Sequence, residues 1–337
     1  MKKTIHLLLV AGLLAGILTT AYAGENKKLA QSGFQFLSVI SDARAAAMAD
    51  AMTSLEIGSS AMFFNPAGMA SMEGFVDMTA SLNYWIADIS HNAFSLAVSP
   101  AGGRYGVFGL SFQNVDYGDF YGTRVDKSTD VGYVDTDVFK LSSMAVGVGY
   151  AKRLNDRFSV GGQVRWVKQD LGESIIPQVS ADLDTSLETV SNELTPLAFD
   201  FGTRFKTGFK SLVFGMSVRN FSKEIQYVEE GFQLPLVFNL GISMNVMDFW
   251  ENAPLKQSLV VSIDASHYRS HPEQLKFGLD YCLMDILSVR GGYVTNNDED
   301  GFSFGVGVSW FGVTFDYAYS PFGIFDKVQR MTARFSM

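Results

Sequence analysis

The sequence predicts an all-β transmembrane protein: an antiparallel outer-membrane β-barrel of about 14 strands with a small, partly helical N-terminal plug. Three observations carry this prediction. First, 47% of the 337 residues are hydrophobic and 18% are charged, yet no apolar run after residue 23 is long enough for a spanning helix. Second, apolar and polar residues alternate along most of the chain. Third, long polar connections alternate with short ones.

The first 23 residues have the pattern of a secretory signal peptide. A Lys2-Lys3 pair precedes the apolar stretch 5–18, and Ala21-Tyr22-Ala23 is a typical small-residue cleavage site. An uncleaved membrane anchor is the alternative, but the apolar stretch is short for one. We therefore expect export and cleavage after Ala23. The single cysteine, Cys282, allows no internal disulfide.

Residues 24–74 differ from the rest of the chain and form the expected plug. The alanine-rich stretch 42–52 predicts a helix with Ser41 or Asp42 as its N-cap, and Asn65-Pro66 predicts the start of a second short helix. The segment is too long for a linker and too small for an independent domain. A barrel of about 14 strands encloses more space than its own side chains fill, so we expect this segment inside the barrel.

Residues 75–337 form the expected barrel. In one example, Phe302, Phe304 and Val306 alternate with Ser303 and Gly305, which is the two-residue period of a β-strand. The predicted strands span residues 75–85, 92–99, 104–114, 138–151, 157–170, 196–206, 211–219, 235–247, 257–267, 274–283, 286–295, 301–310, 312–320 and 328–337. Most of these segments have the length that a tilted strand needs to cross a bilayer.

The connections predict the orientation. If the first strand runs outward, residues 115–137, 171–195 and 220–234 become long outside loops, separated by short periplasmic turns. The connection 247–256 is longer than expected and breaks the rule. We expect a short helix within 177–194. This arrangement places both chain termini in the periplasm.

Charged residues also fall on the predicted inward face of the strands. They are Asp77, Arg165, Asp200, Arg204, Arg219, Asp264, Lys276, Asp280, Arg290 and Asp316. One interpretation is that they pair with one another and with the plug, as buried charges must. The other is a polar conduit. Because both signs are mixed, we favour pairing. A channel for apolar solutes would show more inward aromatic residues than the strands provide.

No motif predicts an enzyme, a cofactor or a metal site. Gly301-Phe302-Ser303-Phe304-Gly305 fits the nucleophile-elbow pattern, but it lies within a predicted strand rather than at a strand-to-helix turn. His91, His267 and His271 fall near loop ends without an evident third ligand. The acidic stretch 296–301 lacks the spacing of a calcium-binding loop. The net charge of −9 and the lack of a basic cluster exclude nucleic acid as an expected partner.

The N-terminal segment also resembles a known family. Its residues Gly33-Phe34-Gln35-Phe36-Leu37, Asp42-Ala43-Arg44-Ala45-Ala46-Ala47-Met48 and Ala61-Met62-Phe63-Phe64-Asn65-Pro66-Ala67-Gly68 resemble the N-terminus of the PorV/PorQ family, part of the FadL-like outer-membrane proteins. The triplet Asn65-Pro66-Ala67 is similar to that of the FadL hatch. The resemblance implies a barrel of fourteen strands with a plug. It also marks Asp42, Arg44, Asn65, Pro66 and Ala67 as plug residues of interest.

The resemblance implies a role without catalysis. A PorV/PorQ-type protein would act in type IX secretion, holding the C-terminal signals of exported proteins and helping to deliver them to the cell surface. Its expected partners are outer-membrane lipid, other secretion components and the C-terminal domains of cargo. The alternatives are FadL-type uptake of hydrophobic small molecules, with the plug as a gate, and a purely structural barrel.

Overall fold

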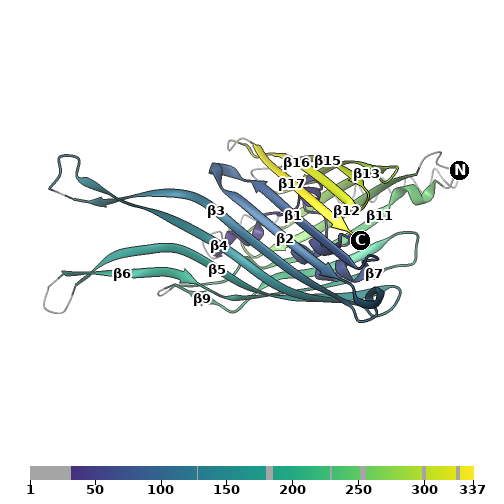
Figure 1. Ribbon diagram of the computed structural model, residues 1–337, viewed down its shortest axis with the longest axis horizontal. Helices are drawn as coiled ribbons and strands as arrows, with labels where there is room; N and C mark the ends of the chain where they lie inside the picture. The colour runs from purple at the N-terminus through teal and green to yellow at the C-terminus, as the bar shows by residue number, and fades with distance from the viewer. Residues whose placement is uncertain are drawn as a thin grey trace.

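The computed structural model describes residues 32–126, 128–179, 185–227, 230–250, 256–297, 301–323 and 327–337. The predicted signal peptide and residues 24–31 lie outside these ranges. Fourteen strands form a closed antiparallel ring, because β1 pairs with β17 and β4 pairs with β5 (Figure 1). The β-barrel expected from the alternating pattern is therefore confirmed.

The ring strands follow one another in chain order. They are β1 (Val76–Tyr84), β2 (Ser90–Val98), β3 (Val107–Val125), β4 (Tyr133–Arg153), β5 (Phe158–Val179), β7 (Leu197–Lys206), β8 (Val213–Phe221), β11 (Val237–Asn245), β12 (Gln257–Tyr268), β13 (Gln274–Leu283), β14 (Leu287–Val294), β15 (Phe302–Trp310), β16 (Val313–Pro321) and β17 (Lys327–Ser336). We call the end where Val76 bonds to Met337 the C-terminal rim. The opposite end, which the connection 85–89 reaches, is the long-loop rim.

Two of the predicted loops are largely strand. β3 and β4 continue beyond the expected loop boundaries of 115 and 137, and β6 (Thr185–Leu194) pairs with the end of β5. The helix predicted within 177–194 is therefore wrong for residues 177–179 and 185–194, and residues 180–184 lie outside the described ranges. Thr189 and Val190 are β-branched, which favours a strand, and the backbone register pairs them with residues 175 and 174.

Short elements complete the connections. They are η5 (Ile86–Asp88), η6 (Pro100–Gly103) and η7 (Val246–Phe249), which are 3-10 helices, and the two-residue strands β9 (Ile225–Gln226) and β10 (Gly231–Phe232). The connection 247–256 is longer than a tight turn because η7 occupies its start, with Asn245 capping the amide of Met247. Among the described residues, no helix is long and apolar enough to cross a membrane.

The outer surface of the ring is apolar. On β15, Phe302, Phe304 and Val306 are about half exposed or more, whereas the intervening Ser303 is buried. The same alternation recurs on most ring strands, so large apolar side chains cover the outside and small or charged ones face the interior. Exposed apolar area of this extent is unusual on a soluble monomer but matches the band that faces lipid on a transmembrane barrel.

The described part of the plug, residues 32–74, lies inside the ring (Figure 1). It contains η2 (Gln35–Ser38), α2 (Ala43–Ala47), η3 (Gly58–Phe63) and η4 (Pro66–Ser71). The chain enters at the long-loop rim, where Ser32 bridges to Gln233, and leaves at the C-terminal rim into β1. Helix α2 packs on β14–β17, η3 on β1–β3, and η4 on β4, β5 and β7. The plug thus touches the wall on several sides.

Both plug helices begin where the sequence predicts, and the first is shorter than expected. Asp42 caps α2 by accepting a hydrogen bond from the amide of Ala45, and Asn65 caps η4 in the same way through Ala67. The first helix was expected to reach residue 52. It ends early because Ala49 and Asp50 adopt left-handed backbone conformations with φ of 51° and 62°.

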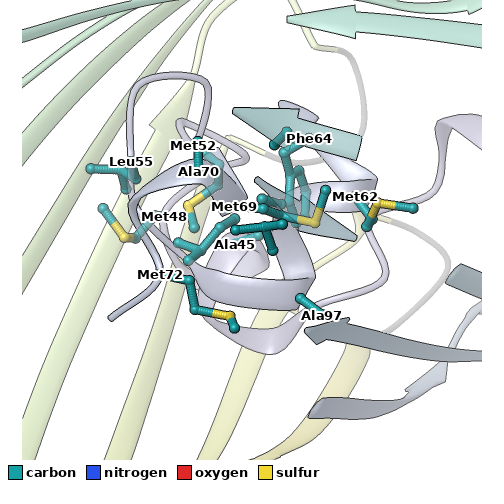
Figure 2. Packing of buried hydrophobic residues seen from close by; sticks show 14 residues of the cluster. Ala45, Met48, Met52, Leu55, Met62, Phe64, Met69, Ala70, Met72 and Ala97 are labelled. Carbon is teal, nitrogen blue, oxygen red and sulfur yellow. The ribbon is translucent and has the colours of Figure 1, made fainter. Parts of the chain in front are cut away.

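The plug packs through small and flexible side chains. Met48, Met52, Met62 and Met69 are buried together with alanines of the plug, and Ala97 of β2 joins them from the wall (Figure 2). Methionine has no branch and adapts to irregular spaces, while alanine allows backbones to approach closely. This composition suits a segment of irregular backbone that must fit a closed cylinder.

Candidate functional site

Asn65 ties two parts of the plug to the barrel wall. Its side-chain oxygen accepts a hydrogen bond from the amide of Ala67 (3.1 Å), and its amide nitrogen donates to the carbonyls of Thr53 (2.6 Å) and Thr203 (3.1 Å) on β7. Pro66 follows at the first helical position. The backbone N–H that proline lacks would have no partner within the helix at this position. Gly202 provides the space, because a Cβ there would overlap the oxygen of Asn65. The Asn65-Pro66-Ala67 triplet therefore fixes plug and wall together.

Arg44 connects α2 to a row of charges on the wall. Its guanidinium lies 2.9 Å from the carboxylate of Asp280 on β13, which also contacts Arg290 on β14 at 3.1 Å. Arg290 in turn pairs with Asp316 on β16. Asp42, besides capping α2, accepts a hydrogen bond from Ser60 at 3.1 Å. The row alternates in sign, so each buried charge lies beside an opposite one.

Asp50 makes the second connection between the plug and the wall. Its carboxylate lies 2.6 Å from the ammonium of Lys276 on β13 and 3.6 Å from the guanidinium of Arg219 on β8. Tyr268 accepts a further hydrogen bond from Lys276 at 2.8 Å. Arg219 also donates to the carbonyl of Phe63 in η3. One plug carboxylate thus joins two separate regions of the wall.

The other predicted inward charges also have partners. Asp200 binds Arg165 at 2.9 Å, within the wall. Arg204 binds Glu56 of the plug at 3.1 Å. Asp77 lies 2.7 Å from Arg334 and accepts a hydrogen bond from the amide of Ser59, and Asp264 accepts one from the amide of Thr53. Nine of the ten inward charges therefore form ion pairs with the wall or the plug, whereas Asp264 is held by the amide of Thr53.

A cavity of about 520 Å³ lies between the plug and the long-loop rim. Its aromatic lining includes Phe34 and Phe36 of the plug, Trp85 after β1 and Phe322 after β16. Its polar lining includes Asp50 and Lys276. We call this space the outer cavity. Its walls come from the plug, the loops and the ends of the strands, which add Tyr117 of β3, Tyr268 of β12 and Phe302 of β15 to its aromatic surface.

Trp85 is the centre of the aromatic side of the outer cavity. Its ring packs edge-on against Phe322, with 4.8 Å between centroids, and the guanidinium of Arg330 lies 5.3 Å from its centroid. His91 lies near the same ring at 6.1 Å. The sequence prediction missed these aromatic residues because it considered only strand faces. The aromatic residues in the plug and the loop ends were the available signal.

A second cavity, of about 250 Å³, lies toward the C-terminal rim. Arg44, Asp280, Arg290 and Asp316 line it, and so does Cys282, the only cysteine of the chain. We call this space the inner cavity. The residues of α2 and its C-terminal turn face both cavities, since Ala46 and Asp50 line the outer one while Arg44 lines the inner one. The plug therefore stands between them.

The structure places the other candidate groups in structural roles. Ser303 lies within β15 and its hydroxyl donates to the carbonyl of Ala47, so it is not at a strand-to-helix turn. His267 contacts Glu273, and His271 contacts Ser270. The acidic loop 296–301 falls partly outside the described ranges. Within those ranges, no group of three or more His, Cys, Asp or Glu side chains could hold a metal ion.

The fold is shared with known outer-membrane channels. The chain is similar to the toluene transporter TbuX of Ralstonia pickettii, with 14% identity over 87% of this chain and 96% of that one and a TM-score of 0.55. It is also similar to the CymD monoaromatic hydrocarbon channel, with 11% identity, 88% and 97% coverage and a TM-score of 0.57.

The chain is also similar to a Pseudomonas aeruginosa FadL homologue, with 15% identity over 88% of this chain and 98% of that one and a TM-score of 0.54. No family model matches the sequence, and no curated protein matches it. At these identities the likeness establishes a FadL-like fold, which agrees with the coarser part of the resemblance seen in the N-terminal motifs.

Proposed function

We propose that the protein conducts small apolar molecules across the outer membrane, with the plug as the gate. The observation that carries this proposal is the outer cavity, whose aromatic residues Phe34, Phe36, Trp85 and Phe322 face the space directly above the plug. Similar structures are described as transporters or channels for toluene and monoaromatic hydrocarbons. These names favour the small-molecule alternative over the secretion role.

The size and chemistry of the outer cavity suit an aromatic solute of one or two rings. An engineered apolar cavity of about 150 Å³ in another protein binds benzene, so a cavity of about 520 Å³ has ample room for a single ring. Edge-on contacts such as those between Trp85 and Phe322 are equally available to a bound aromatic molecule. The nearby ion pairs set a polar boundary at the plug.

Passage requires the plug to change conformation. The ion pairs of Arg44 and Asp50 with the wall hold α2 and its C-terminal turn between the outer and inner cavities. Opening a route along the barrel axis therefore has to break or exchange at least one of these ion pairs. Solute bound against Phe36 and Ala46 would touch the segment that has to move.

The proposed location is the outer membrane, with the C-terminal rim in the periplasm and the long-loop rim outside. The apolar outer surface of the ring supports the membrane location, and the predicted signal peptide supports export. In this orientation the outer cavity opens toward the medium, where a solute is captured. The lipid of that membrane is then the first partner of the protein.

Fluorescence quenching tests the proposal. Bromobenzene is an apolar heavy-atom quencher, and Trp85 is one of four tryptophans. We expect a saturable quenching component in the purified barrel that Trp85→Phe removes. Trp310→Phe is the matched control, because Trp310 is 70% exposed on the lipid-facing side and reports only unsaturable partitioning. If quenching is linear throughout, or if Trp85→Phe leaves the saturable component intact, the outer cavity does not bind apolar solutes.

The type IX secretion role rests on the PorV/PorQ resemblance of residues 33–68 alone. Its partners would be secretion components and cargo C-terminal domains. Gene deletion distinguishes the two roles. Loss of surface-displayed cargo with unchanged hydrocarbon uptake would support secretion, whereas impaired uptake with normal display would support the channel. A purely structural barrel predicts that neither changes.

A further inference from the structure

Two β-hairpins extend past the long-loop rim as separate arms. The first arm is formed by residues 119–125 of β3 and 133–141 of β4, and the second by residues 171–179 of β5 and 185–194 of β6. Figure 1 shows both extending to the left, away from the other strands of the ring. Their neighbour β2 already begins at Ser90, opposite Asp116. The arms therefore stand beyond the closed barrel.

The facing edges of the two arms are open. β4 and β5 pair from Arg153↔Ser159 to Ser142↔Asp170, and within the described residues no pairing joins them beyond that point. Residues 133–141 of β4 then pair only with β3, which leaves one edge of about nine residues without a neighbour. At the usual rise this edge is about 30 Å long. An open edge of this length is a template for another strand.

The arms expose apolar side chains beyond the long-loop rim. Tyr121 and Val125 of β3 are 81% and 78% exposed, and Phe120 stacks on Phe139 across the hairpin with 5.6 Å between centroids. Tyr133, Val138 and Phe139 of β4 are also exposed. Apolar and aromatic exposure beside an unpaired strand edge is typical of a surface that binds a partner.

The arms are strongly acidic. Among the side chains that the structure describes, residues 116–141 have five acidic and two basic ones, and residues 168–194 have three acidic and one basic. The ion pairs Lys140–Asp119 and Lys168–Glu193 involve two of these eight described carboxylates. Both arms, on either side of the open edge, therefore carry more described carboxylates than basic groups. A strand that enters the gap therefore meets favourable electrostatics only if it is basic.

We propose that the open edge of β4, residues 133–141, binds an extended basic segment of a partner polypeptide as an added β-strand. Main-chain hydrogen bonds to β4 would supply affinity, and lysine or arginine side chains of the partner would face the acidic arms. β4 is a better template than β5, because Pro177 removes one backbone donor from the β5 edge. This binding surface is separate from the outer cavity.

A designed peptide tests the proposal on the full barrel in nanodiscs. The probe is a fluorescent peptide of about nine residues in which lysine alternates with threonine and tyrosine, matching the length of the edge. We expect saturable binding that weakens at least tenfold when alternate peptide amides are N-methylated, since N-methylation removes main-chain donors and keeps the charge. Replacing the lysines with glutamates should abolish binding.

Two variants locate the site. Replacing residues 119–139 with a two-residue turn should remove peptide binding, and resistance of the folded barrel to SDS at room temperature shows whether the ring still forms. Asp135→Asn should weaken binding, whereas Asp285→Asn, which changes another exposed carboxylate at the C-terminal rim, should not. Bromobenzene should still quench Trp85 in all of these variants. This result would show that peptide binding and the proposed channel fail independently.

Three outcomes would overturn the proposal. Equal binding of the N-methylated peptide would mean that charge alone attracts it. Equal binding to the shortened arm would place the site elsewhere. Self-association of the free protein that the shortened arm abolishes, without competition by the peptide, would identify a second copy of this chain as the occupant of the edge.

Discussion

The carboxylate of Asp50 lies 2.6 Å from the ammonium of Lys276, and this ion pair joins the plug to β13 at the floor of the outer cavity. Both side chains are buried, at 9% and 4% exposure. Asp50 also occupies a left-handed backbone position, with φ of 62°, which ends the turn after α2 and directs its side chain toward the wall. The segment that separates the two cavities is therefore anchored at the point where a bound solute would touch it.

Lys276→Met should destabilise the protein, because it leaves the carboxylate of Asp50 buried with only Arg219 nearby at 3.6 Å. Breaking a buried ion pair typically costs about 3–5 kcal/mol in the free energy of unfolding. Urea unfolding in detergent measures the loss, and planar-bilayer recordings should show added conductance as the plug loosens.

The double variant Asp50→Asn/Lys276→Met should recover part of the stability, because neither charge is then left alone. Lys256→Met is the matched control. It removes an exposed ion pair with Asp285 at the C-terminal rim and should change neither the free energy of unfolding nor the conductance. Additive losses in the double variant would mean that the two residues act independently.

Asn65→Ala should release the plug while leaving the ring closed. The variant loses the cap on Ala67 and leaves the carbonyls of Thr53 and Thr203 without their donor, a combined cost of about 1–3 kcal/mol. Protease cleavage within 53–67, read by mass spectrometry, should increase. Asn65→Asp keeps the acceptor of the cap but sets a buried carboxylate oxygen against the carbonyls of Thr53 and Thr203, so it should increase cleavage at least as much. Asn155→Ala, which removes a similar cap in an exposed turn, should leave plug cleavage unchanged.

The ring and both plug caps could be predicted from the sequence because each depends on local information. Alternation such as Phe302-Ser303-Phe304 specifies a strand and its faces at once, and Asp42 and Asn65 sit directly before their helices. The inward charges followed from the same alternation. Their partners did not, because the pairing of Asp50 with Lys276 joins residues more than two hundred positions apart.

The arms and the outer cavity could not be read in the same way. In the arms, acidic residues such as Asp119 and Asp135 interrupt the apolar alternation, so the extended strands resembled polar loops. In the outer cavity, Phe36 and Trp85 are brought together by the path of the plug through the barrel, which no local pattern encodes. The arms and the outer cavity both depend on how segments far apart in the sequence are placed together in the fold.

The ion pairs of Glu56 with Arg204 and Lys206 should make the plug less stable in acid where it lies near the C-terminal rim. Partial burial raises the pKa of Glu56, but the charges of Arg204 and Lys206 outweigh it, so its pKa lies below the ordinary value of 4.5. A carboxylate with a lowered folded-state pKa stabilises the fold above its unfolded pKa and loses that contribution as the pH falls through the folded value.

Amide hydrogen exchange near Glu56 should therefore be steady from pH 7 to about pH 5, once corrected for intrinsic rates, and should accelerate below the ordinary glutamate range. Glu56→Gln should show the faster exchange at every pH and lose this pH dependence. An unchanged profile in Glu56→Gln would assign the acid sensitivity to another group.

Cys282 should report which rim faces the periplasm. It lines the inner cavity, on the C-terminal side of the plug, and is partly exposed. If the C-terminal rim is periplasmic, a membrane-impermeant maleimide added to intact cells should leave Cys282 unlabelled, and the same reagent should label it after the outer membrane is permeabilised. Ser38→Cys in a Cys282→Ser background is the control, because Ser38 is exposed in the outer cavity and should react in intact cells.

The same pair of cysteines tests the plug as a gate. In the Lys276→Met variant, a loosened plug should let a small impermeant thiol reagent pass from the outer to the inner cavity, so Cys282 should react in intact cells while a larger reagent remains excluded. Labelling of Cys282 in intact cells by both reagents in the unmodified protein would instead place the C-terminal rim outside, and the orientation proposed for the barrel would be reversed.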